Sequence, residues 1–444
     1  MISVRSFSCL FPLCLSVVPV VVQAEAGGMK IVRVLDVCPV WSGHPVGFCL
    51  LTEGEHQFAA FYDAERRMTV ASRKTDAEKW HLVRLPEKIG WDSHNYITMA
   101  VDADGCLHLS GNMHGSPLVY FRTAKPYDID TFERIAHMVG EREKRATYPR
   151  FLRGPKNELV FNYRDGGSGN GCRLWNVYDP KAKRWRRLID QPLLSGQGKM
   201  NAYPQGPLRD ANGTYHICWV WRDTPDCATN HDLSYARSVD LVHWTTSAGK
   251  PLALPITIET AEIVDPVPAG GGMINSNIRL GFDTKNRPVI GYHKFDADGN
   301  TQAYNARLED GQWRICQTSD WSYRWYFQGG GSIGTELGFG AVAVQPDGKL
   351  SQSYHHTKEG SGIWHLDEKT LKPIGKIKKA SRYPKELGKV ESKVPGMRVR
   401  RCHSTGRGGI EYILKWETLG PNRDRPRKDS PPPSMLRLYE LRAP

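Results

Sequence analysis

After its first 22 residues the sequence contains no long apolar run, no dense cysteine pattern and no sustained helical periodicity. A membrane-spanning helix needs about 18 or more apolar residues, so we expect no membrane span. The ten cysteines stand at irregular spacings, and two of them, Cys9 and Cys14, lie near the N-terminus. This excludes a small disulfide-stapled scaffold, and most of the other cysteines are expected to be buried thiols.

Several functional signatures are also missing. No strand-to-helix phosphate loop with Lys-Ser/Thr is present, and no long Pro/Ser/Gly linker divides the chain. The paired carboxylates of most glycosidases are not evident in the motifs considered below. One degenerate Asp-box, SVDLVHW with Ser238, Asp240 and Trp244, stands without further copies. A sialidase is therefore the least favoured enzyme.

The N-terminus has the pattern of a signal peptide. Arg5 precedes an apolar run from about Cys9 to Val22, and small residues at Ala24 and Ala26 suit cleavage. We predict a signal peptide over residues 1–24, a mature chain of 25–444 that forms one domain, and a secreted or periplasmic location.

The chain has 60 Lys and Arg against 47 Asp and Glu, a formal net charge of +13. In an exported protein this favours an acidic partner through long-range steering. Polyanionic glycans, nucleic acid and anionic lipid all fit this charge, as does a merely solvated basic face.

Short strands and turns recur along the chain. Turn signals at 102–105, 210–213 and 347–348 each precede an alternating strand, and related units occur at PKNELVFNY and TKNRPVIGYH. Neighbouring units are about 50 to 70 residues apart, the period of four-stranded propeller blades. We predict an all-β, seven-bladed β-propeller with little helix, limited to a turn near residues 130–139. The final strand, MLRLYELR, is positioned to close the ring.

Two histidines mark the first candidate site. His94 and His114 stand at the ends of two probable strands of one hairpin, flanked by polar or small residues that include Asn95 and Asn112. A hairpin can return both imidazoles to one rim of the sheet. The alternative is a pair of hydrogen-bonded histidines that only hold loops.

Further candidates follow at the next strand ends. Tyr148 lies in ATYPRF, Arg164 leads the glycine-rich stretch NYRDGGSGNG, and Asn201 and Tyr203 lie in MNAYPQGP. A glycine-rich loop lets a ligand approach the backbone, while a guanidinium can bind a carboxylate or sulfate with two parallel hydrogen bonds. A salt bridge between Arg164 and its neighbour Asp165 is the simpler alternative.

Long strings of this sequence carry a resemblance. They include HPVGF, FYDAERRMTVASR, WDSHNYITMAVD, LSGNMH, TYPRF, NYRDGGSGNG, WRDTPDCATNHDLSYARS and WETLGPNRDRPR. Over essentially its mature length the chain resembles the BNR-4-like family of seven-bladed propeller enzymes. This family includes ulvan lyases and the rhamnosyl-glucuronate enzymes of arabinogalactan breakdown. The resemblance implies an acidic polysaccharide substrate and no nucleic-acid partner.

The resemblance also implies roles. In ulvan lyases two histidines, a tyrosine and an arginine act on a uronate by β-elimination, and His94, His114, Tyr148 and Arg164 look like the matching residues. Tyr203 is a looser match, and Asn95 and Asn112 are expected to bind substrate. Arg164 and His114 would bind the carboxylate, whose neutralisation makes the C5 proton removable, while His94 and Tyr148 share proton transfer.

A second branch of the family cleaves terminal L-rhamnose from glucuronate and uses one histidine on the opposite propeller face. His44 in WSGHPVGF looks like that residue. The sequence favours this branch over ulvan lyases. A histidine that only supports ring closure is the alternative.

A metal site is a separate hypothesis. Cys227 and His231 have the C-x3-H spacing of paired ligands, and His216 and His293 lie on adjacent expected strands. Sulfur together with imidazole favours Zn²⁺, and the family resemblance supports a structural metal here. A metal-free polar cluster remains the alternative.

The leading hypothesis is a secreted enzyme that cleaves L-rhamnosyl-α-1,4-D-glucuronate linkages in arabinogalactan or ulvan by β-elimination. Hydrolysis of the same bond by an α-L-rhamnosidase is the enzymatic alternative. A propeller that binds glycans without turnover is the alternative from another class.

Overall fold

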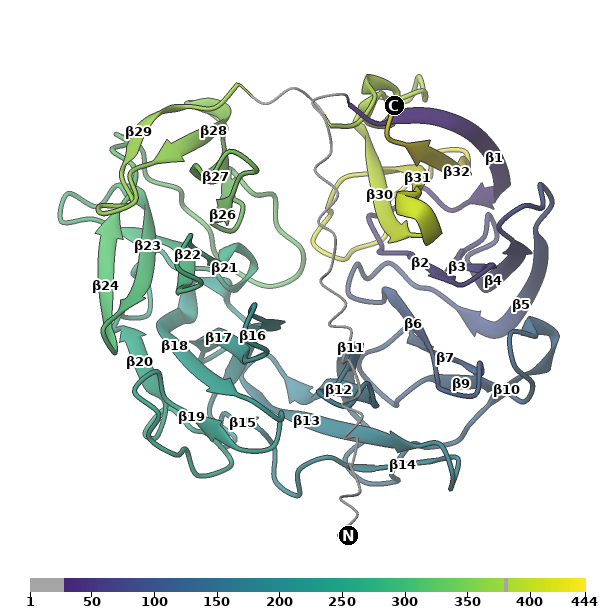
Figure 1. Ribbon diagram of the computed structural model, residues 1–444, viewed down its shortest axis with the longest axis horizontal. Helices are drawn as coiled ribbons and strands as arrows, with labels where there is room; N and C mark the ends of the chain where they lie inside the picture. Colours follow the sequence, from purple (N-terminus) through teal and green to yellow (C-terminus); the bar gives the residue numbers. More distant parts are fainter. Residues whose placement is uncertain (1–27, 379–381) are drawn as a thin grey trace, which may run out of the picture.

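The computed structural model describes residues 28–378 and 382–444, so the predicted signal peptide lies outside the described residues. The described residues form seven antiparallel sheets, each built mainly from consecutive strands. The sheets follow one another around a ring (Figure 1). The predicted all-β propeller is therefore confirmed, and the number of sheets agrees with the predicted seven blades.

The first four sheets run from residue 49 to residue 265. The first sheet contains β2 (Cys49–Glu53), β3 (His56–Tyr62), β4 (Arg67–Lys74) and β5 (His81–Lys88), and the second contains β6 (Ile97–Val101), β7 (Leu107–Gly111), β9 (Tyr120–Thr123) and β10 (Phe132–Arg134). The third contains β11 (Ala146–Arg153), β12 (Leu159–Gly167), β13 (Asn170–Asp179) and β14 (Arg184–Arg187), joined by β8 (His114–Ser116) and β15 (Leu194–Ser195). The fourth contains β16 (Asn201–Arg209), β17 (Tyr215–Arg222), β18 (Asn230–Ser238) and β19 (Trp244–Thr245), joined by β20 (Glu262–Asp265).

The last three sheets complete the ring. Their strands are β21 (Arg279–Phe282), β22 (Pro288–Phe295), β23 (Thr301–Glu309) and β24 (Gln312–Gln317); β25 (Leu337–Phe339), β27 (Leu350–His356), β28 (Gly360–Leu366) and β29 (Pro373–Lys376), joined by β26 (Ala343–Val344); and β30 (Met397–Thr405), β31 (Glu411–Leu419), β32 (Ser434–Arg442) and β1 (Lys30–Val40). β1 pairs antiparallel with β32, so strands from the two ends of the described chain share one sheet. This confirms that MLRLYELR closes the ring.

Aspartates fix the repeated turns before the second strands. Oδ1 of Asp102 accepts the backbone N–H groups of the residues two and four positions later, both at 2.9 Å. Asp210 and Asp283 make the same pair of bonds at 2.8–3.0 Å. An aspartate that bonds its own backbone in this way favours a turn over a continued strand. The turn signals in the sequence therefore mark where β7, β17 and β22 follow.

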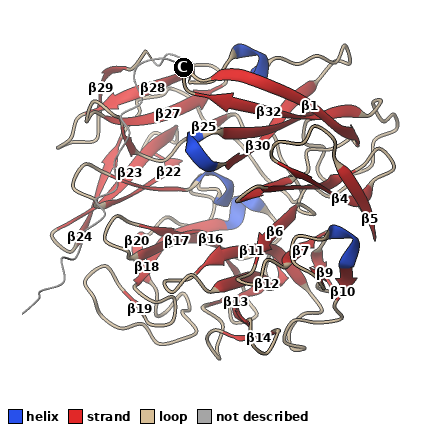
Figure 2. Ribbon diagram, turned by 45° about the vertical axis from the view of Figure 1, so that its right-hand side comes forward, coloured by secondary structure: helices blue, strands red, loops and turns tan. Residues whose placement is uncertain are grey.

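Helical structure in the described residues consists of five short 3-10 turns, η1 (Ile129–Thr131), η2 (Cys227–Thr229), η3 (Asn275–Asn277), η4 (Lys385–Gly388) and η5 (Arg407–Gly409). Figure 2 shows them as minor features among strands. The expected turn near 130–139 is only partly right, because β10 follows η1 at once. In the described part of the chain, no helix is long and apolar enough to cross a membrane.

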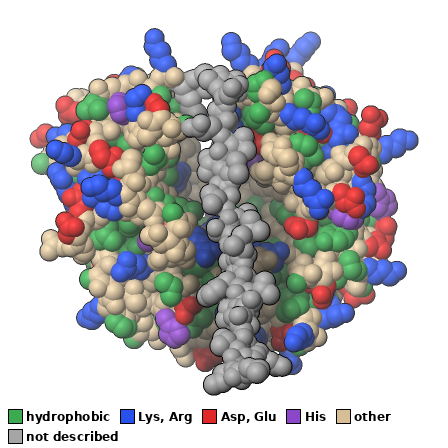
Figure 3. Space-filling view, in the orientation of Figure 1, with side chains coloured by type: hydrophobic (Ala, Val, Ile, Leu, Met, Phe, Trp, Pro, Cys, Tyr) green, Lys and Arg blue, Asp and Glu red, His purple; other side chains and the backbone are tan. Residues whose placement is uncertain are grey.

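Large aromatic side chains fill the space between neighbouring sheets. Trp219 and Trp221 of β17 are fully buried and belong to one apolar cluster with Trp175 of β13. Replacing such a side chain with Ala costs about 3–5 kcal/mol. The surface, by contrast, is strongly charged, and Figure 3 shows Lys and Arg side chains interspersed with Asp and Glu across the face of the ring that it draws. Tightly packed sheets thus support a surface of mixed charge.

Candidate active site

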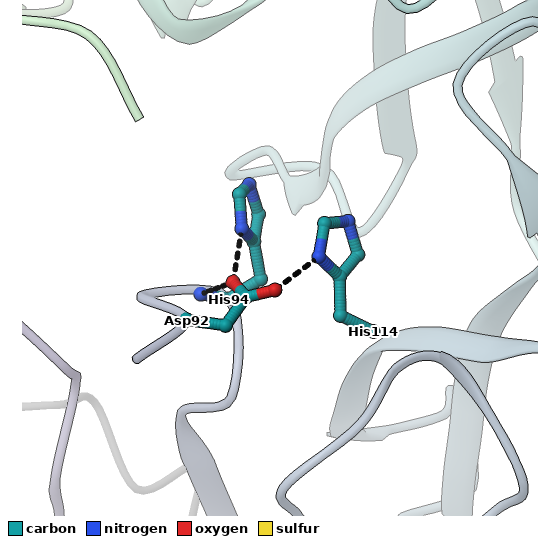
Figure 4. Close-up of side chains that lie close together, drawn as sticks. All are labelled: Asp92, His94 and His114. Carbon is teal, nitrogen blue, oxygen red and sulfur yellow. Dashed lines mark hydrogen bonds and ion pairs between the residues drawn. The ribbon is translucent and has the colours of Figure 1, made fainter. Parts of the chain in front are cut away.

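The carboxylate of Asp92 bridges two stacked histidines by binding one ring nitrogen of each (Figure 4). Its Oδ1 is 2.6 Å from Nδ1 of His94, and its Oδ2 is 2.6 Å from Nδ1 of His114. The two imidazole centres are 4.1 Å apart. Asp92 and His94 come from the turn before β6, and His114 begins β8. The fold therefore brings the two predicted histidines together, with a carboxylate that the sequence analysis did not single out.

This arrangement sets the protonation of the group. Burial alone would raise the pKa of Asp92, but hydrogen bonds from His114 and His94 hold that pKa well below its usual range. Each imidazole binds the Asp92 carboxylate through its Nδ1 atom, and neither Nε2 atom has a hydrogen-bond partner among the described residues. An imidazole nitrogen without a protein partner can accept or donate a proton during a reaction. The pair can therefore supply a donor and a base.

Tyr148 projects from an irregular point of β11. The pairing of β11 with β12 shifts register between Thr147 and Arg150, and Tyr148 has a left-handed backbone with φ of 57°. Bulges of this kind redirect a side chain, and left-handed non-glycine residues concentrate at functional sites. The Tyr148 ring centre lies 5.7 Å from that of His94. Burial, with a further contribution from Tyr203, raises the pKa of Tyr148 well above its usual value, so its hydroxyl stays protonated at neutral pH.

Arg164 packs against the ring of Tyr148 and has no acidic partner among the described residues. It is 3% exposed, its guanidinium carbon is 4.9 Å from the Tyr148 ring centre, and its Nη2 donates to Oγ1 of Thr147 at 3.1 Å. Within the described residues no carboxylate forms an ion pair with Arg164, and Asp165 instead binds Arg142 at 2.9 Å. A buried guanidinium without a counter-charge is costly unless an anion binds there. The alternative of an Arg164–Asp165 salt bridge is therefore wrong.

The remaining substrate-binding candidates divide into two groups. Tyr203 joins the site, because its hydroxyl accepts a 3.4 Å hydrogen bond from Nη1 of Arg164. Asn95 and Asn112 contact each other, and Asn112 also donates to Glu87 at 2.7 Å. These two amides therefore connect the loops around the histidines, which is a structural use of both side chains.

His44 is placed differently from the expectation. Its Nε2 is 3.0 Å from Oδ1 of Asp424, and Oδ2 of the same carboxylate is 3.5 Å from Nδ1 of His94. The His44 side chain is completely buried. One carboxylate cannot reach two opposite faces, so the assignment of His44 to the opposite face is wrong. The cause is the 420–433 loop, whose Asp424 lies between the two histidines.

Asp424 joins four separate loops. It accepts hydrogen bonds from the backbone N and Oγ of Ser93 at 3.0 and 2.8 Å, and from the backbone N of Ser332 at 2.8 Å. Burial alone would raise the pKa of Asp424. The hydrogen bonds from His44 and Ser93 outweigh burial and hold that pKa well below its usual range. Asp424 is a second residue that the sequence did not reveal. Asp92 carried a local signal, the D-x-H spacing, but Asp424 is more than 300 residues away from the histidines.

The predicted zinc ligands do not form one site. Nδ1 of His216 is 2.6 Å from the Tyr235 hydroxyl, and the two ring nitrogens of His231 bind Asp223 and Asp232 at 3.0 and 2.9 Å. In the residues that the structure describes, one group of three possible metal ligands has its ligand atoms within 4.8 Å of one another, and it is Asp92, His94 and His114. The predicted set of His216, Cys227, His231 and His293 is not such a group, although Nε2 of His216 and both ring nitrogens of the buried His293 have no hydrogen-bond partner among the described residues.

The Asp92 group is compact enough to hold a cation. To do so it would give up the two hydrogen bonds between Asp92 and the Nδ1 atoms. As the structure stands, these bonds make Asp92 an orienting carboxylate for two imidazoles, an arrangement that also fixes histidine orientation in hydrolases.

Comparisons with known proteins complete the description of the site. Residues 56–321 match the model of a family described as BNR repeat-containing family members. The crystal structure of the polysaccharide lyase Uly1 is similar, with a TM-score of 0.61, 13% identity, and coverage of 94% of this chain and 100% of that chain. An ulvan lyase of family PL25 has a TM-score of 0.56, 12% identity, and coverage of 88% and 97%. The structure of a PL25 ulvan lyase bound to -[GlcA(1-4)Rha3S]- gives 0.55 at 12% identity. No curated protein sequence matches the chain.

Proposed function

Because the chain belongs to the BNR repeat-containing family and has the fold of known polysaccharide lyases, we propose that it is a glycan-cleaving enzyme. Its proposed substrates are acidic polysaccharides with L-rhamnosyl-α-1,4-D-glucuronate linkages, as in ulvan or arabinogalactan. Its proposed reaction is β-elimination.

The uncompensated guanidinium of Arg164 carries this proposal. It is buried beside Tyr148, whose ring centre lies 5.7 Å from that of His94 and 6.4 Å from that of His114, and it has no carboxylate partner in the described part of the chain. A uronate carboxylate would supply the missing charge. Its neutralisation is also what β-elimination requires, because the C5 proton becomes acidic only when the developing enolate-like charge is stabilised.

The proposed steps use the groups around Arg164. Arg164 and His114 bind the carboxylate, and Nε2 of His94 takes the proton from C5. The electron pair of the C5–H bond forms a C4–C5 double bond as the C4–O bond breaks. The Tyr148 hydroxyl, which stays protonated because burial raises its pKa, donates its proton to the departing oxygen of rhamnose.

Two further observations support the substrate class. The net charge of +13 favours a polyanion through long-range attraction. A PL25 ulvan lyase with the same fold was solved with a glucuronate-containing, sulfated saccharide. The proposed location is outside the cytoplasm, on the basis of the charged and apolar pattern at residues 5–26.

The test is incubation of the purified protein with ulvan and with gum arabic. β-Elimination produces an unsaturated uronate, which is detected by its ultraviolet absorbance, and the free rhamnose assay reports whether terminal residues leave. Rhamnose release without new absorbance would assign hydrolysis in place of elimination. Binding without any product would leave a non-catalytic glycan-binding propeller.

A further inference from the structure

A row of side chains extends from the candidate active site across the third sheet. Thr147 of β11 pairs with His114 of β8 on one side and with Arg164 of β12 on the other. Arg164 pairs in turn with Arg173 of β13. Directly opposed residues on neighbouring strands point to the same side of a sheet. Arg173 therefore lies next to Arg164, on the side away from His114.

The Arg164–Arg173 pair is electrostatically unfavourable. Like charges directly opposite in a sheet are destabilising, and their β-carbons are about 4.5–5.5 Å apart. In the described residues Arg173 forms no ion pair and its guanidinium donates no hydrogen bond, although the side chain is half-buried. Burial lowers the pKa of Arg173 to about 10, and Arg150 and Arg164 add to this effect. The protein itself therefore leaves two neighbouring positive charges without a counter-charge.

One uronate carboxylate can neutralise only one of these charges. We propose that Arg173 binds a second oxyanion of the same glycan, either a sulfate ester or another carboxylate on a sugar next to the reacting uronate. This inference rests on the proposed function of the Arg164 site and makes Arg173 a specificity-determining residue. A guanidinium suits both groups, because its N–H groups match two oxygens at once.

The test compares Arg173→Gln with Arg184→Gln, which removes the same charge from an exposed position on β14 of the same sheet. The substrates are a sulfated uronate polysaccharide, the same polysaccharide after chemical desulfation, and a rhamnosyl-glucuronate disaccharide with one anionic group. On the sulfated polymer, Arg173→Gln should raise KM about tenfold or more with little change in kcat, because a charged hydrogen bond is lost. Arg184→Gln should behave as the wild type.

The other two substrates identify the second anion. Arg173→Gln should leave the KM for the disaccharide unchanged whether the second anion is a sulfate ester or a carboxylate, because the disaccharide has only one anionic group. Loss of the effect on the desulfated polymer assigns a sulfate ester, and its persistence there assigns a carboxylate. An equal rise of KM on the disaccharide, or no change on any substrate, would overturn the proposal.

A binding measurement separates this inference from the proposed function. If the wild type cleaves none of the three substrates, the proposed function fails, yet inorganic sulfate should still raise the melting temperature of the wild type more than that of Arg173→Gln. Equal sulfate-induced shifts would overturn the role of Arg173. Without sulfate, Arg173→Gln should melt no lower than the wild type, because it removes a repulsion. Arg173→Lys, which keeps the charge but loses the paired donors, should retain part of the affinity.

Discussion

At the scale of single residues, the proposed chemistry depends on Arg164, whose charge no carboxylate in the described residues balances. Replacement by Met should lower kcat/KM roughly 10²–10³-fold, because the carboxylate of the substrate loses its counter-charge in the transition state. The melting temperature should not fall in parallel, since a buried charge is removed together with its desolvation cost. Initial rates and thermal unfolding of the same preparation measure both. Equal activity of the variant would contradict the assignment.

Asp92 is the second residue with a sharp expectation. Asp92→Asn keeps the shape of the side chain but removes the charge that both Nδ1 atoms contact at 2.6 Å. Activity should fall roughly 10²–10⁴-fold, because both imidazoles lose the carboxylate that orients their Nδ1 atoms. The matched control is Asp104→Asn, an exposed carboxylate in the turn before β7. If Asp92→Asn kept activity within twofold of the wild type, Asp92 would not take part in the proposed reaction.

The sequence could locate four residues of the site but not their anchors. His94 lies in the turn before β6 and His114 begins β8, as their polar neighbours indicated, whereas Tyr148 and Arg164 lie within β11 and β12 and not at the expected strand ends. Asp424 is close to His94 only because the ring brings the 420–433 loop back to the start of the chain. No local pattern contains that contact.

At the scale of elements, the register shift in β11 directs Tyr148 toward the histidines. Burial and Tyr203 raise the pKa of Tyr148, so the hydroxyl remains a proton donor at high pH. We expect no loss of kcat from ionisation of Tyr148 between about pH 8 and about pH 10, in contrast to an ordinary tyrosine with a pKa of about 10. Tyr148→Phe should lower kcat roughly 10²-fold or more at all these pH values. A variant that keeps full activity would remove Tyr148 from the proton transfer.

Strand positions were predictable, whereas side-chain directions were not. The aspartate turns before β7, β17 and β22 are local, so the sequence contains them. The zinc hypothesis combined the Cys227–His231 pair with His216 and His293, and the last two lie in β17 and β22 of two different sheets. Adjacency of predicted strands does not determine which way a side chain points, and His216 bonds with Tyr235 within its own sheet.

At the scale of the whole molecule, Asp424 ties together the loops that meet where the ring closes. Asp424→Asn should lower the free energy of unfolding by about 2–4 kcal/mol at neutral pH, because bonds to the carboxylate from His44, Ser93 and Ser332 weaken together. Asp424→Asn should also lower kcat, because it weakens the bonds that hold Ser93, and the candidate base His94 lies in the same turn. Asp429→Asn, an exposed carboxylate of the same loop, is the control.

The pH dependence of this effect has a definite sign. The pKa of folded Asp424 lies below that of the unfolded chain, about 3.9, so its stabilisation is complete above that value and is lost as the pH falls through the folded pKa. Urea unfolding of the wild type and of Asp424→Asn should therefore differ most near neutral pH and converge in strong acid. A difference that grows on acidification would contradict this role.

The central claim, cleavage by elimination, is tested most directly by the source of the oxygen atoms in the products. The rhamnosyl-glucuronate substrate is cleaved in water enriched in heavy oxygen, and both products are weighed by mass spectrometry. Elimination adds no water, so the account predicts an unsaturated uronate and a rhamnose whose masses together equal that of the substrate, with no heavy oxygen incorporated during the cleavage step. A saturated glucuronate together with heavy oxygen incorporated during cleavage would show hydrolysis and would contradict the account.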